Sequence, residues 1–297
     1  MKPSCFSTKI DLSFKNKLLN DLKEQGFEFS QPMHTIFAAK KQGIVCVLYK
    51  SGALTVQGKE KDQFIEFYLE PEILKDFSYS YPHEHVDLTS RIGVDEAGKG
   101  DFFGPLSVAG VYAEKDQIKK LINLHIKDSK KISDSNILKL STKIKDLCPF
   151  YSILRLFPQK YNELYAKFKN LNLLLAWGHT TVIANLLEKT KCKKAIIDQF
   201  AKKSVIEDAI SRKKINIEVE QRTHAEEDVV VAAASIIARA GFLTGLDRIS
   251  EKLSIQLPKG ASSKVIEIGK RIVNKHGEEI LFEISKIHFK TKDDILT

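Results

Sequence analysis

The stretch Arg91-Ile-Gly-Val-Asp-Glu-Ala-Gly-Lys-Gly-Asp-Phe-Phe-Gly-Pro105 decides the fold of the larger part of the chain. Ile92 to Val94 form an apolar run typical of a buried strand, and the glycines that follow predict a sharp turn. Asp95 and Glu96 stand at the end of this strand, where active sites open in α/β folds. Neighbouring strand residues point to opposite faces, so we expect both acids to serve one site only if Glu96 already belongs to the turn.

Two further acidic stretches come from distant parts of the sequence. Asp198 closes the apolar strand Lys194-Ala-Ile-Ile-Asp198, and Glu226 lies in His224-Ala-Glu-Glu-Asp228 ahead of an apolar helix. Singly, each acid has an ordinary alternative role as a turn cap or helix cap. Together, carboxylates from separate elements favour a site for two Mg²⁺ or Mn²⁺ ions about 4 Å apart, which activate water and stabilise the leaving oxygen. Asp228 is a reserve candidate for the fourth carboxylate.

The charge balance favours an anionic partner. Lys and Arg outnumber Asp and Glu by 47 to 38 among 297 residues, which gives a net charge of +9. Acidic side chains grouped in a basic chain need a cation between them and a polyanion. This combination points to phosphodiester chemistry on a nucleic acid.

The cellular setting is expected to be the cytoplasm. The N-terminus lacks the apolar stretch of a secretory signal, and no uninterrupted run approaches the 18 or more apolar residues that span a bilayer. The cysteines are widely spaced, which predicts reduced thiols and no zinc site. These cysteines are Cys5, Cys46, Cys148 and Cys192.

The length predicts two domains. Residues 78–90 mix proline, small polar residues and charges without periodicity, as linkers do. We therefore divide the chain into a domain at 1–80, a linker at 81–89 and a larger domain at 90–297. Alternating helices and strands in the larger domain predict an α/β fold with a mixed sheet flanked by helices on both faces. The expected strands are 92–94, 107–112, 151–157, 195–197 and 215–220, and the expected helices are one capped by Ser133, 171–189, 205–212 and 228–248.

The first domain is expected to be a small α+β unit. Its pattern predicts helices at 14–25 and about 62–69 around strands at 35–39, 44–49 and 53–57. Lys40, Lys41 and Lys50 lie in the hairpin turns, and we expect them to crowd one end of the sheet and bind nucleic acid. A merely solvated small sheet fits the same pattern.

The glycine turn after Glu96 satisfies G-x-x-x-x-G-K, but Gly100 stands where a P-loop needs a Ser or Thr hydroxyl. We therefore exclude a nucleoside triphosphate site. Backbone N–H groups at Gly98 and Gly100 are instead expected to approach a ribose-phosphate strand. Lys127-Asp-Ser-Lys-Lys131 is a second candidate phosphate-binding loop, with a solvated loop as the alternative, and Trp177 and His179 are expected to be packing residues.

The chain resembles bacterial ribonuclease HIII, a relative of ribonuclease HII. The motifs that carry the resemblance are Tyr49–Gly58, Gly93–Pro105, Lys127–Ser133, Asp198, Ala232–Arg239, Leu257–Ala261 and Lys275–Gly277. The resemblance implies a ribonuclease H-like catalytic domain behind a TATA-binding-protein-like module, and endonucleolytic cleavage of the RNA strand in RNA/DNA hybrids.

The resemblance also implies residue roles. The metal-binding quartet would be Asp95, Glu96, Asp198 and Glu226. The loop that reads 2′-hydroxyls would be Gly98, Lys99 and Gly100, and the loop that contacts the nucleic-acid backbone would be Asp128, Ser129 and Lys130, with Lys131 beside it. Using Glu226 requires a one-residue contraction relative to the family spacing. Ala261-Ser262 lacks the tyrosine typical of ribonuclease HII near Lys259-Gly260, which favours hybrid cleavage over cleavage at single ribonucleotides in duplex DNA.

Three other functions stay open. They are a non-catalytic nucleic-acid-binding protein, ribonuclease HII-type junction cleavage, and a DNA-directed nuclease on the same architecture. For the leading hypothesis the partner is an RNA/DNA hybrid, with no membrane and no obligatory protein partner, and we expect a monomer.

Overall fold

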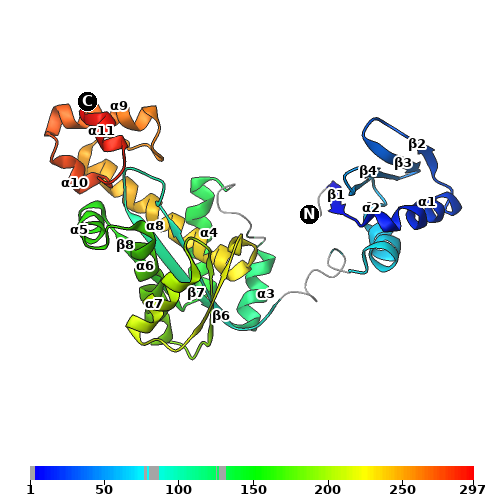
Figure 1. Cartoon of the computed structure of the whole chain (residues 1–297), viewed down its shortest axis with the longest axis horizontal. Helices are drawn as coiled ribbons and strands as arrows, with labels where there is room; N and C mark the ends of the chain where they lie inside the picture. The colour runs from blue at the N-terminus through cyan, green and yellow to red at the C-terminus, as the bar shows by residue number, and fades with distance from the viewer. Residues whose placement is uncertain (1–3, 77–78, 80–86, 125, 127–131) are drawn as a thin grey trace. The chain divides into compact units, whose positions relative to one another are not determined.

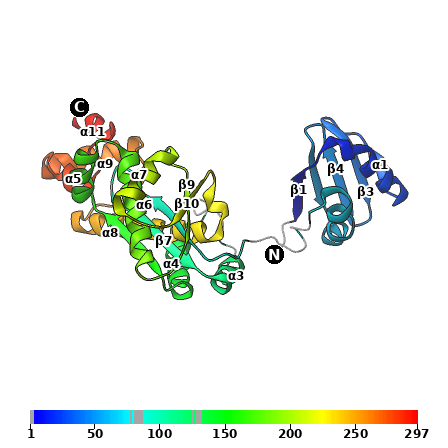
Figure 2. The same cartoon turned by 60° about the horizontal axis from the view of Figure 1, so that its bottom comes forward.

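The computed structural model describes residues 4–76, 79, 87–124, 126 and 132–297. The chain forms two compact units, Met1–Asp87 and Leu88–Thr297 (Figures 1 and 2). Most of the expected linker lies outside the described residues. So do Asp128, Ser129, Lys130 and Lys131 of the expected backbone-contacting loop.

The first unit is a five-stranded antiparallel sheet of order β1-β5-β4-β3-β2. Its strands are β1 (Cys5–Lys9), β2 (Glu28–Ser30), β3 (Thr35–Lys41), β4 (Ile44–Tyr49) and β5 (Ala53–Gln57). Its helical segments are η1 (Leu12–Phe14), α1 (Lys15–Glu24), α2 (Lys61–Phe64) and the π-helix η2 (Ile65–Leu74). The three expected strands are present, and the two edge strands β1 and β2 are additions to the prediction. Helix residues such as Leu18 and Leu69 share one core with Cys46 and Leu54 of the sheet.

The strand register corrects the expected position of the turn lysines. Lys40 and Lys41 end β3, whereas Lys50 follows Tyr49, which pairs with Thr35 at the start of β3. At about 3.4 Å per residue, the length of β3 separates the two groups by roughly 20 Å. The expectation that they crowd one end of the sheet is wrong, because successive turns of an antiparallel sheet lie at alternate ends.

The second unit contains the mixed sheet that the sequence predicts, with the order β10-β9-β6-β7-β8. β10, β9 and β6 are parallel to one another, and β7 and β8 extend the sheet in antiparallel fashion. The strands are β6 (Arg91–Ala97), β7 (Leu106–Ala113), β8 (Tyr151–Leu156), β9 (Lys194–Asp198) and β10 (Glu218–Arg222). β10 begins three residues later than expected.

Helices cover both faces of this sheet (Figures 1 and 2). The helical segments of the unit are α3 (Lys115–Asn123), α4 (Asp134–Leu147), α5 (Pro158–Phe168), α6 (Leu171–Leu187), α7 (Lys203–Lys213), η4 (Ala225–Glu227), α8 (Val229–Leu253), α9 (Ser263–His276), α10 (Ile280–Ile284) and α11 (Thr291–Leu296). The core joins sheet residues such as Val94, Val108 and Ile197 to Leu175 and Val182 of α6. α3, α5, α10 and α11 are additions to the prediction.

Helix α8 is long and apolar enough to cross a membrane by length and composition alone. However, 83% of its apolar stretch is buried inside the unit. Its position is that of a core helix lying against the central strands β6 and β7. The helix is therefore only weak evidence for a membrane span, and its packing in the core explains its apolar composition.

Candidate active site

Strand β6 carries the first two acids and is longer than expected. It runs to Ala97, so Asp95 and Glu96 both belong to the strand rather than the turn. They do point to opposite faces, because Asp95 receives a hydrogen bond from Ser235 of α8 and Glu96 contacts His179 of α6. Both nevertheless line the same cavity, although Glu96 lies in the strand and not in the turn.

The cavity opens where two neighbouring strands separate. β6 pairs with β9 only as far as Val94 and Ile197, whereas its pairing with β7 continues to Ala97. Beyond Val94 the β9 side of β6 is therefore open, and Asp198 ends β9 at the same level. The resulting cavity has a volume of about 440 Å³. Its lining includes Asp95, Glu96, Asp198, Glu226, Gly98, Lys99, Gly100, Ser235, Arg239 and Lys259.

Glu226 reaches the cavity through a contact between η4 and β9. The Ala225 N–H donates a hydrogen bond to Oδ1 of Asp198 at 3.2 Å. This bond holds the short η4 turn against the end of β9 and places Glu226 beside Asp198. The structure thus brings together the four acids of the quartet from three separate segments of the chain.

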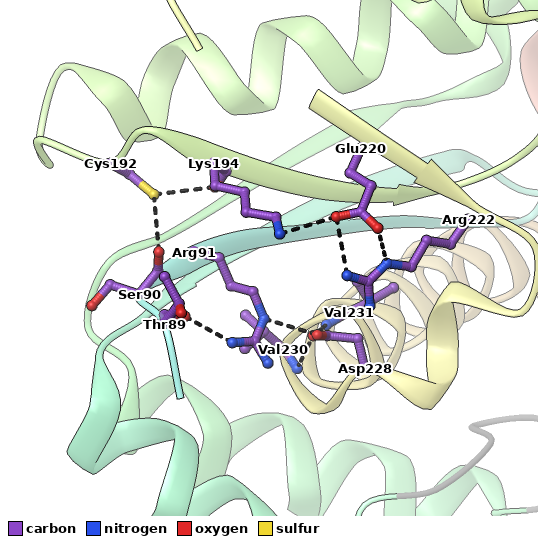
Figure 3. A network of polar contacts seen from close by, with 10 residues as sticks. All are labelled: Thr89, Ser90, Arg91, Cys192, Lys194, Glu220, Arg222, Asp228, Val230 and Val231. Atoms are coloured by element: carbon purple, nitrogen blue, oxygen red, sulfur yellow. Dashed lines mark hydrogen bonds and ion pairs between the residues drawn. The ribbon is translucent and has the colours of Figure 1, made fainter. Parts of the chain in front are cut away.

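The reserve candidate Asp228 has a different position, and it is absent from the residues that line the cavity. Its carboxylate caps α8 by accepting hydrogen bonds from the N–H groups of Val230 and Val231, at 2.9 and 3.3 Å. It also pairs with Arg91 at 2.8 Å, and the two side chains are only 4% and 2% exposed (Figure 3). Asp228 therefore joins the start of α8 to the start of β6.

Burial and neighbouring charges give the two acids of β6 different pKa values. Burial raises the pKa of Asp95 to about 7, and the adjacent charge of Glu96 acts in the same direction. Burial also acts to raise the pKa of Glu96, but the hydrogen bond from His179 and the charge of Lys99 outweigh it and lower that pKa to about 2. Glu96 thus carries negative charge at neutral pH, and a cation in the cavity would favour ionisation of Asp95 as well.

The donor atoms suit a hard divalent cation. Mg²⁺ and Mn²⁺ prefer carboxylate oxygens, and the quartet supplies four carboxylates. In the described part of the chain, no three Asp, Glu, His or Cys side chains converge tightly enough to enclose an ion in this arrangement. Instead, Glu96 binds the Lys99 ammonium at 3.0 Å, and Asp95 accepts a hydrogen bond from the Glu96 N–H at 2.8 Å. The quartet shares a cavity, and its side chains must shift to share an ion.

The glycine turn beside the quartet has two glycines with different structural demands. Gly98 has φ +89°, and a Cβ there would lie 2.3 Å from the Pro105 carbonyl oxygen. Gly100 lies outside the left-handed region, and a Cβ there would meet nothing within 4 Å. The fold therefore requires glycine at position 98 but not at position 100.

This difference gives a matched pair of variants. We expect Gly98→Ala to lower the free energy of unfolding by about 2 kcal/mol or more. The alanine would have to adopt a left-handed backbone conformation, and its Cβ would clash with the Pro105 carbonyl oxygen. Gly100→Ala should change that free energy by no more than about 0.5 kcal/mol and should lower kcat/KM on a hybrid by obstructing close approach of the substrate. Chemical denaturation and cleavage kinetics check both. Wild-type kinetics for Gly100→Ala would contradict the close approach.

Lys286 fixes the segment that follows the glycine turn. Its side chain is fully buried, and its Nζ donates hydrogen bonds to the carbonyl oxygens of Asp101 and Gly104, both at 2.8 Å. Burial lowers the pKa of Lys286 to about 7, against the opposing effect of the Asp101 charge. The C-terminal part of the unit therefore holds the loop next to the site.

The lowered pKa of Lys286 predicts a pH-dependent stability. Between pH 7 and the ordinary lysine range, the unfolded chain binds a proton that the folded chain does not, so stability rises with pH by at most about 1.4 kcal/mol per pH unit. Lys286→Met removes this contribution. Denaturation of both proteins at pH 7.0, 7.75 and 8.5 should show the wild type gaining stability relative to the variant. A constant difference would contradict the prediction.

Two cations, Arg239 and Lys259, also line the cavity, and Arg239 is not among the site residues that the sequence predicts. Asp134 pairs with Arg239 of α8 at 2.8 Å and also with Lys259. Arg239 follows Ser235 by four residues, so both lie on one face of α8, and this spacing is a signal that the sequence contained. His179 is buried as expected, but its contact with Glu96 makes it more than a packing residue.

Comparisons with known proteins agree with this geometry. The family model described as Ribonuclease HII matches residues 92–292, which assigns the larger unit to the class of ribonucleases H. A second model, described as Domain of unknown function (DUF3378), matches residues 8–80.

Similar proteins along the whole chain define the family more closely. The ribonuclease HIII of Protochlamydia amoebophila is 52% identical, over 98% of this chain and 96% of its own length. That of Chlamydia felis is 47% identical, over 98% and 97%. The crystal structure of Bst-RNase HIII in complex with Mn²⁺ matches with a TM-score of 0.69 and 29% identity, over 99% of this chain and 98% of that one. The chain belongs to the ribonuclease HIII family, and this confirms the expected fold class and the expected endoribonuclease.

Proposed function

We propose that the chain hydrolyses the RNA strand of RNA/DNA hybrids in the cavity between β6 and β9. The observation that carries this proposal is the quartet of acids lining one cavity together with Gly98, Lys99 and Gly100. Membership of the ribonuclease HIII family supports endonucleolytic cleavage of such hybrids.

The quartet Asp95, Glu96, Asp198 and Glu226 would hold divalent ions, either Mg²⁺ or Mn²⁺. The Mn²⁺ in the Bst-RNase HIII crystal structure supports this choice. Bound ions supply activation of water and neutralisation of charge on the phosphate. The protein contributes the placement of the oxygens: β6 fixes Asp95 and Glu96, β9 fixes Asp198, and η4 fixes Glu226.

The surrounding groups suit an RNA strand. Gly98, Lys99 and Gly100 line the cavity, and we propose that the N–H groups of this turn and the Lys99 ammonium meet a 2′-hydroxyl and its phosphate. The 2′-hydroxyl separates RNA from DNA. Arg239 and Lys259 add positive charge at the same cavity. We keep Asp128, Ser129, Lys130 and Lys131 as proposed contacts to the nucleic-acid backbone.

A substrate panel tests the proposal. Labelled RNA/DNA hybrid, duplex DNA, and duplex DNA with one ribonucleotide should be incubated with the protein and either Mg²⁺ or Mn²⁺. We expect many internal cuts in the RNA strand of the hybrid and an intact all-deoxy duplex. A shifted band without cleavage would support the non-catalytic alternative. Preferential cutting at the single ribonucleotide would support ribonuclease HII-type specificity, and cutting of the all-deoxy duplex would support a DNA-directed nuclease.

We propose residues 1–80 as the substrate-binding domain, 81–89 as the linker and 90–297 as the catalytic domain. In the first unit, Val45 and Val47 of β4 are half buried and alternate with the fully buried Cys46. Lys40 pairs with Val45 in the register and so lies on the same face, which points away from the core. This face is the proposed surface for the hybrid. The cytoplasmic location and the monomeric state remain predictions.

The opposite positions of the turn lysines make this proposal testable. If each end of the sheet contacts one phosphate, Lys40→Gln and Lys50→Gln should each reduce the salt dependence of hybrid binding by about one unit of slope. Binding titrations between low and moderate salt measure the slope. If only one variant changes it, the contact lies at that end. Two unchanged slopes would contradict a role for these lysines.

A further inference from the structure

His179 contacts the carboxylate of Glu96 from the interior of the unit. The side chain lies on α6 and is fully buried, and its Nε2 is 2.9 Å from Oε2 of Glu96. Its ring packs against Phe200 with 4.8 Å between ring centroids. An ionised carboxylate only accepts hydrogen bonds, so Nε2 is the donor in this contact.

Packing alone does not account for a histidine at this position. Its other nitrogen, Nδ1, is buried and has no hydrogen-bond partner among the described residues. A buried polar atom without a partner destabilises the folded state, and an apolar side chain of similar size would avoid that cost. The contribution that an apolar residue cannot make is the hydrogen bond to Glu96.

The two side chains that contact Glu96 differ in exposure. Lys99 binds Oε1 from a side chain that is 45% exposed, so it can leave when a cation approaches. His179 binds Oε2 from a side chain that is fully buried on a core helix, so it stays in place. Oε1 is consequently the oxygen that becomes available, while Oε2 keeps the carboxylate in one orientation.

We propose that His179 is a positioning residue that orients Glu96 for a divalent cation. The inference rests on the proposed function, because it takes Glu96 as a metal ligand. Residues that hydrogen-bond to metal ligands fix ligand orientation, and their loss typically reduces metal affinity or activity by about 10- to 100-fold. His179 would act on the cation through Glu96 without touching it.

The test measures Mn²⁺ binding to the full-length protein by calorimetry. We expect His179→Leu to weaken Mn²⁺ binding by about 10- to 100-fold. His179→Gln should recover most of the affinity, because its amide nitrogen can reach the place of Nε2. His179→Asn carries the same amide on a shorter side chain that ends near Nδ1, so it should bind as weakly as His179→Leu. Thr180→Val changes the adjacent, equally buried residue, whose hydroxyl bonds to the Ala176 carbonyl, and should leave Mn²⁺ affinity unchanged.

Melting temperatures without metal separate orientation from folding. A purely structural role would lower the melting temperature of the His179 variants and leave the Mn²⁺ affinity of the folded proteins equal, which would overturn the inference. Equal Mn²⁺ affinities for the Gln and Asn variants would also overturn it. If Asp95→Asn binds Mn²⁺ as tightly as the wild type, the proposed metal site itself fails. If Asp95→Asn weakens Mn²⁺ binding and His179→Leu does not, only the positioning role of His179 fails.

Discussion

Asp95→Asn is expected to reduce cleavage of an RNA/DNA hybrid by about 1,000-fold or more while the protein becomes no less stable. Asparagine keeps the shape of the side chain and an oxygen for the Glu96 N–H, but it loses the negative charge. Burial and Glu96 both act against the ionised form of Asp95, so removal of its charge relieves repulsion in the folded state. Loss of activity together with retained or increased stability is the behaviour of a functional residue.

The measurement combines cleavage kinetics, hybrid binding and thermal unfolding. Glu220→Gln is the matched control, since Glu220 is a strand carboxylate outside the cavity that pairs with Lys194 at 3.0 Å and with Arg222 (Figure 3). We expect this control to cleave at the wild-type rate. Unchanged cleavage by Asp95→Asn would show that Asp95 takes no part in the reaction. Equal losses of cleavage rate in both variants would show a nonspecific effect of charge.

Asp228→Ala is expected to lower the free energy of unfolding by about 3–5 kcal/mol, because it removes the buried carboxylate that pairs with the Arg91 guanidinium. The same change removes the cap of α8, which contributes about 1 kcal/mol. Glu226→Gln should instead leave stability within about 0.5 kcal/mol, because the Glu226 side chain is 32% exposed, and should greatly reduce cleavage.

Chemical denaturation and hybrid cleavage of the two proteins distinguish the neighbouring acids. Asp228→Asn serves as a second variant, since asparagine is a good helix cap but lacks the charge that Arg91 requires. If folded Asp228→Asn protein fails to cleave while Glu226→Gln protein cleaves normally, the fourth carboxylate is Asp228 and the assignment to Glu226 is wrong.

The sequence predicts the centre of the larger unit well because its strongest signals coincide there. An apolar strand, a glycine turn and paired acids locate the end of β6, and the short strand before Asp198 locates β9. Apolar runs bounded by turn residues give the strand positions with little ambiguity. The parallel pairing of these two strands then brings Asp95 and Asp198 to one edge of the sheet.

Other features depend on long-range packing that a linear pattern does not encode. The edge strand β2 has only three residues and no detectable period. Helix α6 is apolar on all sides, so no face of it marks His179 as a neighbour of Glu96. The shared cavity of Asp95 and Glu96 arises because β9 ends before β6 does, and only the register between the strands reveals this.

A crystal structure of the protein soaked with Mn²⁺, with the ions located by their anomalous signal, tests the central claim most directly. The account predicts Mn²⁺ in the cavity between β6 and β9, with oxygens of Asp95, Glu96, Asp198 and Glu226 at about 2.0–2.6 Å from the ions. Ions bound only elsewhere, or a cavity in which these carboxylates stay too far apart to share them, would contradict it.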